Sequence, residues 1–152
     1  MSSWFFLDSS ALIKLYHQEL GTERVEEIFA TDAPLVISEL AVVELHSGLA
    51  RKVRTGEIPA ESCDEAVRSF EQDCAERFAI EPLNSAVAQQ AKELLNKHGR
   101  QRALRSLDAL QLATFAIVRA REEAIFVCAD GHLCEIVRLQ GSSVMNPEEA
   151  VP

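Results

Sequence analysis

The chain has 152 residues, of which 47% are hydrophobic and 26% charged, and this composition is that of a globular domain large enough to bury a core. No apolar run reaches the roughly 20 residues of a membrane-spanning helix, and no basic segment precedes the first apolar run as in a signal peptide. We therefore expect a cytoplasmic protein with no membrane partner. The formal net charge of −9 argues against a general nucleic-acid-binding surface, although basic residues gather at 51–54 and 97–105.

Apolar runs typical of short strands alternate with amphipathic helical patterns along the chain. The strands are expected at 4–7, 35–37, 78–82, 124–129 and around 144. Helices are expected at 9–18, 22–29, 39–56, 61–77, 85–98, 107–122 and 132–139. Ser38, Asn84 and Ser106 are suited to be N-caps of three of these helices, because their side-chain oxygens can accept a hydrogen bond from the first turn.

The alternation of strands and helices predicts the fold class, because strands separated by helices pair in parallel. The expected class is α/β, a three-layer α/β/α sandwich with a central, mostly parallel sheet. The sequence contains no internal repeat, low-complexity tract or linker. Residues 1–152 are therefore predicted to form a single domain.

The four cysteines form no CxxC pair and are expected to be reduced. Cys128, His132 and Cys134 cluster in the sequence, but their spacing matches no common zinc pattern. Since Cys128 lies in the apolar run AIFVCA, we interpret the two thiols as core residues beside a surface histidine.

Two acids each follow an apolar strand directly. Asp8 ends the run WFFL, and Asp130 follows FVCA. The carboxyl ends of parallel strands meet at one edge of a sheet, where α/β proteins place their sites, so the two side chains can converge there. For Asp8 alone, an N-cap of the following helix is an equally good explanation.

Two further acids lie among apolar or small neighbours on expected helices. Glu44 shares a helix face with Leu40, Ala41 and Gly48, so we expect it to be partly buried and to meet a cation, either an Arg or a metal. Asp108 lies in the first turn of its helix, where the helix dipole also favours an acid.

A convergence of these carboxylates favours a metal site, because the acids would otherwise repel one another and raise each other's pKa. Hard oxygen ligands without a His or Cys set select Mg2+ or Mn2+ rather than zinc. Such a cluster is suited to phosphodiester hydrolysis, in which a metal ion activates water and stabilises the leaving oxygen.

Four segments, in this order, resemble the motifs of PIN-domain ribonucleases of the VapC type, the toxins of bacterial and archaeal toxin–antitoxin pairs. The segments are FLDSSALIKLY, SELAVVELHSGL, LRSLDALQLATF and FVCADGHL. The later VMNP is similar to the family's final strand and Asn-Pro, so the resemblance spans essentially the whole chain.

The resemblance implies a PIN-like α/β/α sandwich and Mg2+- or Mn2+-dependent cleavage of RNA. The metal-binding and catalytic acids would be Asp8, Glu44, Asp108 and Asp130. The family's Ser or Thr position falls on Ser9 or Ser10, and we include Ser9, which is adjacent to Asp8. The family usually forms homodimers and is inhibited by a small cognate antitoxin in the active-site groove.

The alternative is a catalytically weak PIN-like module that binds a regulatory partner. The presence of all four acids argues against it. A haloacid-dehalogenase-type phosphatase fits poorly, because it would need a second Asp two residues after the first, where Ser10 stands.

Overall fold

The computed structural model describes residues 3–149, so the outermost residues of the predicted domain, 1–2 and 150–152, lie outside the described part. The strands in this part are β1 (Trp4–Leu7), β2 (Leu35–Ser38), β3 (Phe78–Glu81), β4 (Ala124–Val127) and β5 (Val144–Met145). The helices are α1 (Ser9–Leu12), the 3-10 helix η1 (Ile13–Leu15), α2 (Thr22–Phe29), α3 (Glu39–Arg54), α4 (Ala60–Glu76), α5 (Ser85–His98), α6 (Ser106–Arg119) and α7 (Gly131–Leu139).

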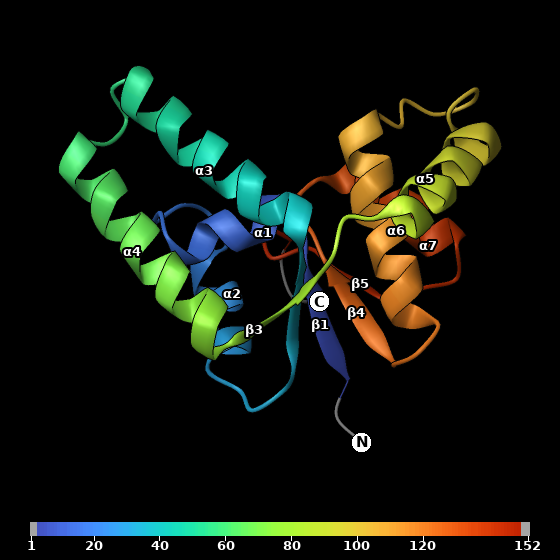
Figure 1. Ribbon diagram of the computed structural model, residues 1–152, viewed down its shortest axis with the longest axis horizontal. Helices are drawn as coiled ribbons and strands as arrows, with labels where there is room; N and C mark the ends of the chain where they lie inside the picture. Colours follow the sequence, from blue (N-terminus) through green and yellow to red (C-terminus); the bar gives the residue numbers. More distant parts are fainter. Residues whose placement is uncertain (1–2, 150–152) are drawn as a thin grey trace.

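The five strands of the described chain form one sheet in the order β3-β2-β1-β4-β5, with every neighbouring pair parallel. The sheet separates α1 to α4 on one side from α5, α6 and α7 on the other (Figure 1). The predicted α/β/α sandwich with a central parallel sheet is confirmed. Because all strands run the same way, their carboxyl ends share one edge, as the convergence of Asp8 and Asp130 requires.

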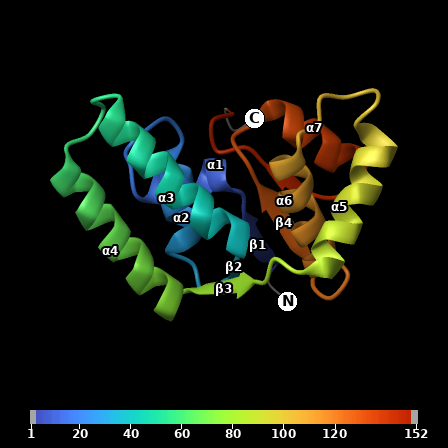
Figure 2. The same ribbon diagram turned by 45° about the horizontal axis from the view of Figure 1, so that its top comes forward.

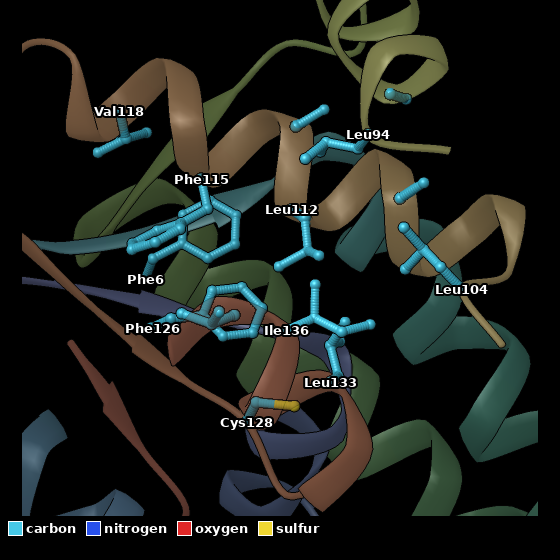
Figure 3. Packing of buried hydrophobic residues seen from close by; sticks show 14 of the residues in the cluster. Phe6, Leu94, Leu104, Leu112, Phe115, Val118, Phe126, Cys128, Leu133 and Ile136 are labelled. Atoms are coloured by element: carbon cyan, nitrogen blue, oxygen red, sulfur yellow. The ribbon is translucent and has the colours of Figure 1, made fainter. Parts of the chain in front are cut away.

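One core lies between the sheet and the helices α5, α6 and α7. Phe6 of β1 stacks on Phe126 of β4, with ring centroids 5.7 Å apart, and meets the edge of Phe115 of α6 at 5.6 Å (Figure 3). All three rings are buried, and the cluster extends through Leu112, Leu133 and Ile136. This apolar block holds α6 and α7 rigidly against the central strands, so residues on these helices have fixed positions relative to β1.

A second core fills the other face of the sheet, under α1 to α4. Phe70 of α4 is completely buried, with its ring 5.3 Å from Tyr16 and 6.2 Å from Phe78 of β3. Leu45 and Leu49 hold α3 against the same cluster. Figure 2 shows that α1 lies between α3 on one side and α6 on the other, so α1 is enclosed by the two helices that carry Glu44 and Asp108.

Several predicted boundaries differ from the structure, among them the end of α6, which lies at Arg119 rather than at 122. The first helix ends at Leu12 and continues as η1 only to Leu15, short of the expected residue 18, because Thr22 Oγ1 donates to the Lys14 carbonyl and folds the chain back. Ser106 is the first residue of α6 and not its N-cap; Arg105 occupies that position. Strand β4 ends at Val127, before the expected residue 129, because the Ala129 N–H donates to Ser10 Oγ.

Residues 147–148 pack against the loop between η1 and α2. The ammonium of Lys14, 2% exposed, contacts Glu19 Oε1 at 3.0 Å and Glu148 Oε1 at 2.8 Å. Gly21 has φ +89°, and a Cβ there would stand 2.8 Å from the Pro147 carbonyl oxygen. Within residues 3–149, no helix has the length and apolar character that crossing a bilayer requires.

Candidate active site

Asp8 stands at the carboxyl end of β1 and is the N-cap of α1. Its Oδ2 accepts hydrogen bonds from Ser10 Oγ at 2.6 Å, from Ser10 N at 3.3 Å and from Cys128 Sγ at 3.5 Å. The side chain is 6% exposed. All these bonds reach Oδ2, and Oδ1 receives none from residues 3–149, so one oxygen fixes the carboxylate while the other stays available.

The pKa of Asp8 is raised from 3.8 to about 6, mainly by burial and to a smaller extent by the charge of Glu44. The hydrogen bonds from Ser10 and Cys128 act in the opposite direction, because they favour the ionised form. These hydrogen bonds thus offset part of the free energy that burial of the ionised Asp8 side chain costs. The contribution from Glu44 also shows that the two predicted acids lie close enough to interact.

Glu44 reaches the start of α1 from the side of α3. Its Oε1 accepts from Ser9 Oγ at 2.8 Å and from Gln111 Nε2, on α6, at 3.0 Å. The same Gln111 nitrogen donates to Ser9 Oγ at 2.8 Å. The predicted partial burial of Glu44 is confirmed, but its hydrogen-bond donors within the described residues are a hydroxyl and an amide, not the arginine considered in the sequence analysis.

Asp108 lies one turn before Gln111 on α6, and residues three apart share a face of a helix. This spacing directs it towards the side of α6 that meets Ser9 and Glu44. Its Oδ2 pairs with Arg105 Nε at 3.3 Å, and its side chain is 22% exposed. Within the described residues, Asp108 is therefore held by a neighbouring cation on its own helix.

Asp130 is the N-cap of α7, where its Oδ1 accepts from His132 N at 3.0 Å and Leu133 N at 3.2 Å. It is linked to Asp8 through a buried thiol, because Cys128 Sγ contacts Asp8 Oδ2 and accepts from Asp130 N at 3.3 Å. Cys128 and Cys134 are both fully buried, so the interpretation of these thiols as core residues is confirmed.

Asp8 is thus related to Glu44 through the interaction of their charges and to Asp130 through Cys128, whereas within residues 3–149 no hydrogen bond or ion pair joins Asp108 to the other three acids. Among residues 3–149, no group of three His, Cys, Asp or Glu side chains is arranged to hold a metal ion. The donors that fit a hard cation best are the unbonded carboxylate oxygens of Asp8 and Glu44. A divalent cation between them would relieve both the desolvation of Asp8 and the repulsion from Glu44.

A groove of about 360 Å³ opens beside Glu44. It is lined by Leu40, Val43, Glu44, Ser47, Gly48, Arg51 and Leu107. Val43 and Leu107 are 64% and 51% exposed, so the groove offers apolar contacts next to the carboxylate, together with the guanidinium of Arg51. A ligand in this groove would thus meet apolar surface and one cation before it reached the acids.

The parallel sheet has a buried acid, Asp8, at the end of its first strand, and the next residue, Ser9, donates to an acid on α3. These features define an α/β domain with an acidic site. The model of the PIN domain family matches residues 5–138, and the chain belongs to this family. The resemblance found in the sequence is thereby confirmed. PIN domains are nucleases and generally use divalent metal ions.

Solved structures with the same fold come from several organisms. FitAcB from Neisseria gonorrhoeae aligns with a TM-score of 0.71 and 18% identity over 96% of this chain and 99% of that one. VapC20 from Mycobacterium tuberculosis, described as a Sarcin-Ricin loop cleaving toxin, gives 0.65 and 18% over 86% and 93%. VapBC2 from Rickettsia felis, bound to a DNA fragment from its promoter, gives 0.66 and 16% over 93% and 97%.

At these identities the likeness establishes the fold. A search of curated protein sequences gave no match.

The sequence analysis missed Gln111, and for the family's serine position it chose Ser9 rather than Ser10. Ser10 and Gln111 hold the side chains of Asp8 and Glu44 through hydrogen bonds. The signal for Gln111 is a single amide in the otherwise apolar run ALQLA, and it is 1% exposed. Such a residue can be recognised as unusual in a sequence, but its partners follow only from the packing of α6 against α1 and α3.

Proposed function

We propose that this chain is a Mg2+- or Mn2+-dependent endoribonuclease, the toxin of a type II toxin–antitoxin pair, which hydrolyses RNA phosphodiester bonds. The proposal is carried by the proximity of Asp8 and Glu44 at the strand-end edge of a PIN fold: their charges interact, and Glu44 accepts a hydrogen bond from Ser9, the residue next to Asp8. Asp108 and Asp130 complete the proposed set of metal-binding and catalytic acids, with Ser9 as a further site residue.

The divalent ion would supply activation of water and charge stabilisation at the scissile phosphate. Asp8 would present Oδ1 to it, since Oδ2 is engaged by Ser10 and Cys128. Glu44 would present Oε2, since Oε1 is engaged by Ser9 and Gln111. Each carboxylate is thus held by one oxygen, which restricts the orientation of the other and favours a well-defined donor pair.

The charges around the candidate site fit either a basic or an acidic partner. An acidic edge next to a groove suits a basic segment of an antitoxin, and several similar structures are toxin–antitoxin complexes. RNA would instead require bound metal together with cations such as Arg51 in the groove. A homodimer, which the family resemblance implies, and a cytoplasmic location, which is expected from the sequence, are part of the same proposal.

The first experiment compares wild type with Asp8→Asn after induction in a bacterial host, by mapping newly formed RNA 5′ ends. Asp32→Asn is the matched control, because Asp32 is an exposed acid just before β2, at the opposite edge of the sheet. We expect discrete new ends and growth arrest with wild type and Asp32→Asn, and neither with Asp8→Asn. Cleavage that survives in both Asp8→Asn and Asp108→Asn would overturn the proposal.

A second candidate is a PIN-like module that binds a regulatory partner and is catalytically weak. It is favoured by the lack of a three-ligand metal arrangement among residues 3–149. Purified wild type incubated with RNA and Mn2+, with EDTA as the control, separates the two candidates. Absence of metal-dependent cleavage, together with tight binding of a co-expressed antitoxin, would favour the binding module.

A further inference from the structure

We propose that Gln111 is a positioning residue, which fixes the carboxylate of Glu44 and the hydroxyl of Ser9 so that the site can take up a divalent cation. This inference rests on the proposed function and adds a residue that lies outside the four-acid set. Gln111 itself would not touch the metal or the RNA in this role. It would act through the two side chains that it holds.

The geometry is a closed triangle of hydrogen bonds between three elements. Gln111 Nε2 donates to Ser9 Oγ at 2.8 Å and to Glu44 Oε1 at 3.0 Å, while Ser9 Oγ donates to Glu44 Oε1 at 2.8 Å. Both hydrogens of the amide and the hydroxyl proton are thereby used. The triangle ties α6, α1 and α3 together at the edge where the acids meet.

The orientation of the amide follows from the partners. If the amide were turned over, its oxygen would face the Glu44 carboxylate and Ser9 Oγ, whose proton is already donated to Glu44, so two acceptors would meet without a hydrogen. In the orientation observed, Gln111 Oε1 is buried and has no hydrogen-bond partner within the described residues. The network around Glu44 therefore determines how this side chain is placed.

The unpartnered oxygen argues that Gln111 does more than fill space. A buried polar atom without a partner costs free energy, and an apolar side chain of the same length would avoid that cost. Its neighbours in sequence, Leu110 and Leu112, show that apolar residues suit this part of α6. A buried amide at this position is explained by the two hydrogen bonds that it donates, to Ser9 and to Glu44.

Gln111→Met tests the inference, because methionine keeps the length of the side chain and removes both donors. Thr114→Val is the matched control: Thr114 is also 1% exposed on α6, but among residues 3–149 its hydroxyl bonds only to the Leu110 carbonyl of its own helix, at 2.8 Å. The measurements are the Kd for Mn2+ alone by titration calorimetry, kcat and KM with RNA, and the urea midpoint without metal.

We expect Gln111→Met to weaken Mn2+ binding and to lower kcat, each by about 10- to 100-fold, as is typical when a residue that orients a metal ligand is lost. KM and the urea midpoint should remain close to wild type, because the folded core is unchanged. Thr114→Val should bind Mn2+ as wild type does. A role in packing alone would instead lower the urea midpoint and leave the Kd of the folded protein unchanged, and this result would overturn the inference.

A double-mutant cycle with Glu44→Gln tests whether Gln111 acts through Glu44. In the Glu44→Gln background, Gln111→Met should produce no further loss of Mn2+ affinity, since the carboxylate that it orients is already absent. Independent, additive losses would overturn the inference. Should Gln111→Met not fold, Gln111→Asn keeps the amide but is one methylene shorter; wild-type Mn2+ affinity in this variant would likewise overturn it.

The outcome for wild type separates this inference from the proposed function. If wild type binds Mn2+ and cleaves RNA while folded Gln111→Met does both equally well, only the role of Gln111 fails. If wild type neither binds Mn2+ nor cleaves RNA, the proposed function and the inference fail together.

Discussion

The Asp8→Asn substitution should stabilise the metal-free protein while it abolishes function. Asn keeps a side-chain oxygen that can accept the hydrogen bonds from Ser10 and can still cap α1, so the local structure is retained. It removes a carboxylate that is 6% exposed and lies near the charge of Glu44. The expected gain in stability is the free energy that wild type loses by keeping this group ionised.

The magnitude follows from the pKa of Asp8, which burial raises from 3.8 to about 6. Above about pH 6 the group is ionised in both the folded and the unfolded chain, and the folded state is disfavoured by roughly 3 kcal/mol at most. Below about pH 4 it is protonated in both states and the penalty vanishes. The stability contributed by the neutral carboxyl is therefore lost as the pH rises from about 4 to about 6.

Urea unfolding of wild type, Asp8→Asn and the control Asp32→Asn at several pH values measures this effect. Without metal, Asp8→Asn should exceed wild type by up to about 3 kcal/mol at neutral pH and by only about 1 kcal/mol near pH 4.5. Saturating Mn2+ should close the gap, because ligand at about 100 times its Kd stabilises a folded protein by about 2.7 kcal/mol. A difference that is absent, or that does not change with pH, would refute the assignment of Asp8 as a buried carboxylate held ready for a cation.

Three further substitutions test the fold around the site. Phe70→Ala should lower the free energy of unfolding by about 3–5 kcal/mol, because the ring is fully buried between α4 and the sheet; urea denaturation would show this. Lys14→Met should cost about 1–3 kcal/mol and expose residues 146–149 to limited proteolysis, since the ammonium holds Glu19 and Glu148. Gly21→Ala should lower the thermal midpoint, because its φ of +89° and a carbonyl oxygen 2.8 Å from the added Cβ both disfavour a side chain; an unchanged midpoint would contradict the geometry of this turn.

Local patterns were sufficient to predict most of the elements. The run WFFL is β1, the helix expected at 22–29 is α2, and the helix at 85–98 is α5 with Asn84 as its cap, since Asn84 Oδ1 accepts from Val87 N at 3.2 Å. These segments are bounded by residues whose own side chains or backbone end the element. Periodicity and capping chemistry act within a few residues, so a single sequence contains enough information to locate them.

The incorrect boundaries depend on contacts between distant segments. The first helix ends early because Thr22 and the buried Lys14 draw the following loop back onto it, and Lys14 is paired with Glu148 at the other end of the chain. Strand β4 ends early because Ala129 bonds to Ser10. A local pattern contains no information about partners more than a hundred residues away, so these terminations could not be predicted from it.

The acids of the candidate site were identifiable because each is a charged residue in a setting where charge is costly. Asp8 and Asp130 follow apolar strands, and Glu44 lies on a half-buried face of α3. Gln111 was not identified, because a neutral amide in a helix has many ordinary explanations. The roles of all these residues in catalysis and metal binding remain predictions, which the experiments above test.

The two oxygens of the Asp8 carboxylate allow this residue to be a helix cap and, as proposed, a metal ligand at the same time. The cap and the contacts from Ser10 and Cys128 use Oδ2. Because Oδ1 accepts no hydrogen bond from residues 3–149, capping does not compete with a cation for the same lone pairs. The cap instead prevents rotation of the carboxylate, which lowers the conformational entropy lost when Oδ1 binds an ion. Glu44 follows the same rule, with Oε1 held by Ser9 and Gln111 and Oε2 left available. Loss of the Oδ2 contacts should therefore weaken metal binding even when the ligand oxygen itself is unchanged.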